Sequence, residues 1–206
     1  MSADADELRS SRLDWQTVAI WTDEIVAGEP SELRAAFRAR GARGPDIVWS
    51  PSVERMAAEP LRFLLRYWSE LRAERPMPYA REIDPIEMRP ALGYILLVDV
   101  LESGQDFRYR LFGSTIAGVS GFDMTGRRVS EHKASPYIVE FALAVYRAAL
   151  RRPEPLLTEH GPPATLNTFA WHRLVLPLAD ESGTIGRFLV GNIPATRDGR
   201  PIALRL

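Results

Sequence analysis

The sequence predicts an α+β fold with an antiparallel sheet. Two strand-like runs, at 94–101 and 107–112, flank a short polar turn, and a helical middle and about three further strand-like runs follow. Strands arranged around a helical insert favour an antiparallel sheet over alternating βαβ units. The 206 residues are enough for one domain with an extension, or for two small domains.

The strands are assigned from their hydrophobic patterns. Residues 94–101 form a nearly continuous apolar run that only Asp99 interrupts, and 107–112 alternate apolar side chains with arginines, as a half-buried strand does. The three later strands are assigned to 153–159, 168–178 and 185–193. Segment 179–184 joins the last two strands and has the residue types of a hairpin turn.

The helices of the main domain show apolar stripes or cap residues. The clearest stripe is Leu61, Leu64, Leu65, Trp68 and Leu71, at the spacing of one helix face. Asp84 followed by Pro85 predicts the start of a second, short helix. Residues 113–119 and 136–151 are predicted to form a short and a longer helix between the two groups of strands.

Residues 1–50 are predicted to form a helical extension. Asp14 can cap a helix that Gly28 ends, and a second short helix precedes the glycine- and proline-containing segment 41–45, the best linker in the chain. Trp15, Trp21 and Trp49 belong to this region or border it. Such large aromatic side chains need cover, either from the main domain or from a second subunit.

Composition excludes several classes of function. The net charge of −1 gives no global field that would recruit nucleic acid or an anionic membrane. The absence of cysteine excludes disulfides, thiolate nucleophiles and cysteine-ligated metals. No apolar run approaches the roughly 20 residues of a membrane span, and the polar, acidic start does not read as a secretory signal. We therefore expect a cytoplasmic protein of bacterial type.

Several short motifs follow one another along the main domain: the 64–71 helix with Tyr67-Trp68, Ile83-Asp84-Pro85, residues 107–114, Met124-Thr125-Gly126-Arg127, residues 176–180 and Gly183. In this order they resemble the motifs of PAS domains, and of one bacterial PAS-like family of about 200 residues that is common in alphaproteobacteria. The resemblance covers about 61–193, within a predicted PAS-like domain at 51–206.

This resemblance implies a five-stranded antiparallel sheet with helices on one face that enclose a pocket. It implies sensing or partner binding in signal transduction, without a known ligand. PAS domains often dimerise through an N-terminal helix, so a homodimer through the helices of 1–50 is expected.

The expected ligand is small and largely apolar, with a polar end. The candidate lining residues are Tyr109, Leu111, Phe122, Phe141, Tyr146, Trp171 and His172. They follow from the expected side-chain directions, which a register slip of one residue would reverse. The polar candidate, His172, could line the pocket or be a structural strand residue.

Neither haem, flavin nor metal is expected, although His132 lies near the region where haem-binding PAS domains place their histidine. Arg108 and Arg110 could clamp an anion, but pairing with Asp99 or Glu102, or simple solvation, is the favoured interpretation.

The function predicted is a stand-alone sensory or regulatory module that binds a small ligand or a signalling partner and has no catalytic activity. The alternative is a ligand-free interaction module, whose cavity its own side chains fill. An enzyme would need an acid–base pair, for which Asp99 with Tyr109 is the only candidate, so none is expected.

Overall fold

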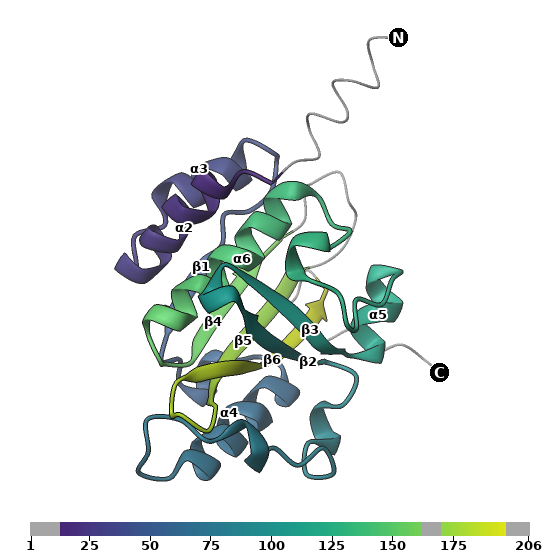
Figure 1. The fold of residues 1–206 in the computed structure, drawn as a ribbon. Helices are drawn as coiled ribbons and strands as arrows, with labels where there is room; N and C mark the ends of the chain where they lie inside the picture. The colour runs from purple at the N-terminus through teal and green to yellow at the C-terminus, as the bar shows by residue number, and fades with distance from the viewer. Residues whose placement is uncertain (1–12, 162–169, 197–206) are drawn as a thin grey trace.

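A six-stranded antiparallel sheet organises the chain, with strand order β1-β4-β5-β6-β2-β3 (Figure 1). The structure is a computed structural model and describes residues 13–161 and 170–196. The strands are β1 Asp46–Trp49, β2 Ile95–Leu101, β3 Asp106–Phe112, β4 Leu156–His160, β5 Ala170–Ala179 and β6 Ile185–Ala195. The predicted α+β, PAS-like fold class is confirmed; residues 168 and 169 of one predicted strand lie outside the described residues.

Helices and 3-10 turns connect the strands. The α-helices are α2 Trp15–Ala27, α3 Ser31–Arg38, α4 Glu59–Arg72, α5 Ser114–Ser120 and α6 Pro136–Arg151. The 3-10 turns are η1 Val53–Arg55, η2 Ala80–Glu82, η3 Arg89–Ala91, η4 Glu102–Gly104 and η5 Val129–Glu131. The short helix expected after Asp84 is therefore only a 3-10 turn that begins at Arg89.

The sheet has one strand more than expected, because β1 lies inside the segment predicted to be helical. Asp46 to Trp49 pair with β4 in antiparallel register, from Asp46↔Glu159 to Trp49↔Leu156. All four residues are half-buried, so they carry no alternation that a sequence pattern could detect. The division at residue 50 stays a prediction, while Val18, Leu33 and Phe37 of the extension share one buried cluster with the sheet.

Helices cover both faces of the sheet, whereas one covered face was expected. α6 lies across one face and α2 packs on α6, while α4 covers the opposite face (Figure 1). The physical reason lies in the central strands. The seven residues from Arg173 to Ala179 are all buried, so both faces of β5 need cover from water.

α4 keeps the predicted apolar stripe against the sheet. Leu61, Leu64 and Trp68 are buried there, and the Trp68 indole Nε1 donates a hydrogen bond of 2.7 Å to the Pro177 carbonyl on β5. Burial of an indole with its N–H satisfied combines a large apolar contribution with no unpaired donor. This helix therefore anchors the face of the sheet that lies away from α6.

The N-terminal tryptophans find their cover mainly within the chain. Trp21 is buried in the cluster that includes α6, and the Trp49 Nε1 donates to the Ile25 carbonyl at 2.9 Å. Trp15 remains 45% exposed, with the Arg147 guanidinium 5.0 Å above its ring. The apolar stripe of α2 is thus buried on α6 of the same chain.

Asp99 gathers three arginines on the α4 side of the sheet. Its carboxylate accepts hydrogen bonds from Arg187 Nε at 2.7 Å and Arg110 Nε at 3.1 Å, and Arg108 Nη2 lies at 3.3 Å. Arg108 and Arg110 therefore pair with Asp99 across the hairpin. Burial raises the pKa of Asp99, but the bonds and charges of Arg187 and Arg110 outweigh it, so this pKa lies below its usual value.

Replacing Asp99 with asparagine is expected to destabilise the fold by about 1–2 kcal/mol, below the usual cost of losing buried charge-assisted bonds, because the remaining arginines reach solvent. The measurement is urea unfolding at pH 7. The matched control is Asp23→Asn, which breaks an exposed pair with Arg151 and is expected to change stability by less than about 1 kcal/mol. Equal losses in both variants would contradict a special role for the Asp99 cluster.

Candidate ligand-binding cavity

A cavity of about 560 Å³ lies between the α6-side face of the sheet, α5, the segment 121–135 and the first half of α6. Its volume is in the range of small-molecule sites. Aromatic rings dominate its wall: Tyr109, Phe112, Phe122, Tyr137 and Trp171. Aliphatic side chains fill the spaces between them: Leu96, Ile116, Val119, Ile138, Val139 and Ala142. The cavity therefore suits a mainly apolar occupant.

Two hydrogen bonds from β3 amides hold the segment that follows α5 against this strand. The Tyr109 amide donates to the Arg127 carbonyl at 3.0 Å, and the Phe112 amide donates to Thr125 Oγ1 at 3.2 Å. Asp123 closes the turn by accepting from the Thr125 amide at 2.8 Å and from its hydroxyl at 2.7 Å. The motif Met124-Thr125-Gly126-Arg127 thus covers the β3 edge and closes one side of the cavity.

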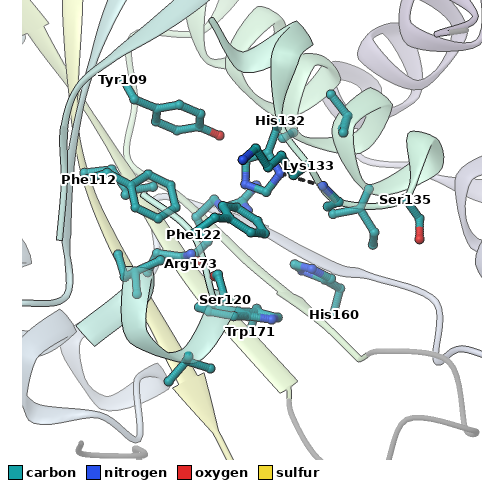
Figure 2. A pocket seen from close by; sticks show the side chains of 18 of the residues that line it. Tyr109, Phe112, Ser120, Phe122, His132, Lys133, Ser135, His160, Trp171 and Arg173 are labelled. Atoms are coloured by element: carbon teal, nitrogen blue, oxygen red, sulfur yellow. Dashed lines mark hydrogen bonds between the residues drawn. The ribbon is translucent and has the colours of Figure 1, made fainter. Parts of the chain in front are cut away.

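His132 stands among three aromatic rings of the wall (Figure 2). Its ring centre lies 5.9 Å from that of Tyr109, 6.2 Å from Phe112 and 5.1 Å from Phe122. Its Nδ1 accepts a hydrogen bond from the Ala134 amide at 3.1 Å, which assigns the proton of the neutral ring to Nε2. Burial first, and then the charge of Arg173, lowers the pKa of His132 to about 4.

His160 borders the cavity at the end of β4. Its ring meets Phe37 and Phe141 edge-on, at 6.0 Å and 5.1 Å between centres. Burial is the main reason, and Arg173 the second, that its pKa falls to about 3. Both cavity histidines are therefore neutral at pH 7 and can donate or accept a hydrogen bond without adding charge.

The sheet side of the cavity is polar. Arg173 on β5 and Asn192 on β6 are paired neighbours in the antiparallel register, and both line the space. Each is buried, with 7% and 6% of its surface exposed. The cavity thus combines an apolar wall with a polar floor that includes a charged group.

Three of the seven predicted lining residues border the cavity, namely Tyr109, Phe122 and Trp171. The other four lie elsewhere: Leu111, Phe141, Tyr146 and His172. Phe141 and Tyr146 are fully buried in the core and do not reach the space. A role in ligand binding stays a prediction for all seven.

Regular strand alternation predicts Leu111 on the same face as Tyr109, and therefore in the cavity. The register between β2 and β3 shifts, however, so that Leu97 faces Leu111 and Val98 faces Tyr109. This β-bulge moves the inward position by one residue, to Phe112, and leaves Leu111 39% exposed. A bulge is not visible in the alternation of residues 107–112.

His172 faces away from the cavity. Adjacent residues of a strand point to opposite faces, so Trp171 and His172 cannot both line it. The His172 Nε2 lies 3.9 Å from Glu159 Oε1 on the opposite face, while Arg173 returns to the cavity side. Strict alternation from Trp171 would have identified Arg173 as the polar group.

Other candidate chemistry is not assembled by the fold. Asp99 and Tyr109 do not form a pair, because Asp99 points to the α4 side and Tyr109 lines the cavity. Across residues 13–161 and 170–196, no group of three or more histidine and carboxylate side chains could hold a metal ion. In the same ranges, no helix has the length and apolarity that a membrane crossing requires.

An antiparallel sheet with a helical roof over an internal cavity is the arrangement that the resemblance to PAS domains implies. Residues 56–192 match the family model described as PAS domain, which is more than half of the chain. The chain belongs to the PAS domain family. Neither the curated proteins nor the solved structures give a match. The family supports a sensory or regulatory role in general.

Proposed function

We propose that this protein is a cytoplasmic sensory module that binds a small, largely apolar ligand with a polar end in its cavity and has no catalytic activity. The observation that carries this proposal is the cavity of about 560 Å³, with its aromatic wall and the buried Arg173 and Asn192 on its floor. A well-formed apolar pocket with a few convergent polar groups is the usual form of a ligand site.

Binding would be transmitted because the occupant touches the sheet and the elements that cover it at the same time. The wall includes β3 and β5 of the sheet, but also Ile116 of α5 and His132 of the connecting segment. A ligand that binds one arrangement of these elements better shifts their equilibrium by the difference in affinity. A signalling protein that contacts the same elements would then sense occupancy. This partner is part of the proposal.

A homodimer through the N-terminal helices stays a prediction within this scheme. The apolar stripe of α2 is already buried on α6, so such a dimer would have to use the outer surface, where Trp15 is 45% exposed. The second candidate function, a ligand-free interaction module, is favoured by Ile86 and Leu92, which are 73% and 51% exposed between α4 and β2.

Filling the cavity is expected to abolish ligand binding. Ala142 lines it from α6, so Ala142→Phe would place a ring in the space. Native mass spectrometry of the purified protein and thermal shifts across a metabolite library are the measurements. We expect a bound or stabilising small molecule for the natural protein and none for this variant.

The matched control is Ala35→Phe, the same change at an exposed position of α3, which is expected to bind as the natural protein does. A natural protein of ligand-free mass that no library compound stabilises would overturn the proposal in favour of the interaction module. Binding that survives in Ala142→Phe would place the ligand outside this cavity.

A further inference from the structure

Arg173 is a buried cation in the floor of the cavity. Only 7% of its surface is exposed, and its Nε and Nη1 have no hydrogen-bond partner within the part of the chain that the structure describes. No ion pair among residues 13–161 and 170–196 includes it. The ring of Tyr146 lies 6.0 Å from its guanidinium carbon and offers only a weak π contact. An uncompensated buried guanidinium is costly, because its desolvation is not offset.

The neighbours of Arg173 form a polar row across three strands. Thr158 on β4 and Asn192 on β6 are its paired residues in the sheet, so the three side chains lie side by side on one face. Thr158 Oγ1 and Asn192 Oδ1 are also buried and have no hydrogen-bond partner among the residues that the structure describes. At the cavity wall, the same is true of His160 Nδ1 and Tyr137 Oη. The border of an otherwise apolar space thus includes polar atoms that lack partners among the described residues.

The charge balance of the cavity points to the sign of its occupant. Lys133, the other basic side chain of the wall, is exposed to solvent, and the two histidines are neutral for the reasons given above. The single buried positive charge of Arg173 is therefore balanced by a ligand that carries one negative charge. A guanidinium presents parallel N–H groups that fit a planar carboxylate, whereas a phosphate dianion would leave one charge unbalanced.

We propose that the cavity binds an amphiphilic monocarboxylate, whose carboxylate pairs with Arg173 and whose apolar body lies among Tyr109, Phe112 and Phe122. Figure 2 shows these rings and Arg173 around the same space. The Tyr137 hydroxyl and the His160 Nδ1, when it carries the ring proton, border the same space and can donate to the remaining lone pairs of the carboxylate. This inference rests on the proposed function, since it names the class of ligand for that site.

The experiment varies the head group on a constant body. Decanoate, decanamide and decyl phosphate, with naphthylacetate and naphthylacetamide as an aromatic pair, are titrated into the full chain by calorimetry at pH 7. At least one acid is expected to bind about ten- to a hundredfold more tightly than its amide, which is the range for one charge-assisted pair. In Arg173→Met the preference for the acid should disappear.

A second measurement separates ligand recognition from a structural role. Removing an uncompensated buried charge is expected to raise the melting temperature of the ligand-free protein, whereas loss of a structural arginine would lower it. Arg173→Lys keeps the positive charge but loses the two parallel N–H groups of the guanidinium, so it should retain a reduced preference for the acid over the amide. Arg187→Met is the matched control: it changes an arginine of the neighbouring strand that faces Asp99, and it should leave the preference unchanged.

The outcomes are distinct. Equal affinity for acid and amide would overturn the carboxylate inference and leave the proposed function intact. Tighter binding of decyl phosphate would overturn it in favour of a phosphate ligand. If no acid, amide or phosphate bound and the metabolite library also gave no shift, both proposals would be overturned.

Discussion

Acidification from pH 6.5 to pH 4 is expected to remove several kcal/mol of folding stability. His132 and His160 have pKa values of about 4 and 3 in the folded protein, against 6.5 for an unperturbed histidine. Burial is the main cause, and the charge of Arg173 is the second. Below pH 6.5 these histidines therefore take up protons in the unfolded chain, while in the folded chain they stay neutral down to their lower pKa values.

The sign and size follow from this difference in bound protons. The stability of the neutral, buried histidines is fully present above pH 6.5 and is lost as the pH falls towards the folded pKa values. Each histidine costs about 1.4 kcal/mol per pH unit in that window, so the two together cost about 3 kcal/mol per unit. Burial also lowers the pKa of His172, which adds to the loss in the same direction. The Asp99 cluster acts in a separate and lower window, because its pKa lies below that of an ordinary aspartate.

Urea unfolding at a series of pH values between 7.5 and 4.5 measures this slope. The double variant His132→Gln with His160→Gln cannot take up these two protons, so its slope should be smaller by about 3 kcal/mol per unit. His172→Gln is the control on the opposite face and should reduce the slope less. A slope that is the same in the natural protein and the double variant would show that both histidines titrate normally in the folded state.

The sequence predicted those parts of the fold that depend on long periodic patterns. The stripe of Leu61, Leu64 and Trp68 identified α4, and the alternation in 107–112 identified β3. β1 was not predicted, because its four residues are all half-buried and show no alternation of apolar and polar side chains. Helices on both faces of the sheet follow from the uninterrupted burial of β5. That burial depends on the position of β5 inside the sheet, which the sequence pattern alone does not reveal.

The candidate site could be predicted only in part, because its residues meet through register and loop geometry. Tyr109 and Trp171 follow from strand direction, whereas Phe112 depends on a bulge that no local pattern shows. His132 and His160 lie 28 positions apart and border the same cavity because the segment after α5 folds back over the sheet. Arg173 did carry a signal, since a charged residue within a continuous apolar strand needs a partner.

Replacing Gly113 with alanine is expected to destabilise the protein by about 3 kcal/mol, at the upper end of the usual cost of overpacking. An added Cβ would lie 2.4 Å from the Gly93 carbonyl oxygen, 2.7 Å from its carbon and 2.8 Å from the Ile95 oxygen. All three are backbone atoms, so no side-chain rotation can relieve the contact. The backbone angles of Gly113 are open to any residue, which makes the effect steric.

The contact matters beyond stability because it positions α5. The Thr115 and Ile116 amides donate to the Gly93 carbonyl at 3.0 and 3.3 Å, so the start of α5 is tied to the atoms that the new Cβ would displace. Ile116 lines the cavity, and ligand binding should weaken together with stability.

The matched control for this change is Gly161→Ala. Among the described residues its Cβ would meet only Arg43, at an ordinary 3.7 Å. The stability of this variant in thermal and urea unfolding should stay within about 0.5 kcal/mol of the natural protein. If Gly113→Ala unfolded at the same urea concentration as Gly161→Ala, the Gly93 backbone must yield at little cost. The close approach would then not be what holds α5 over the cavity.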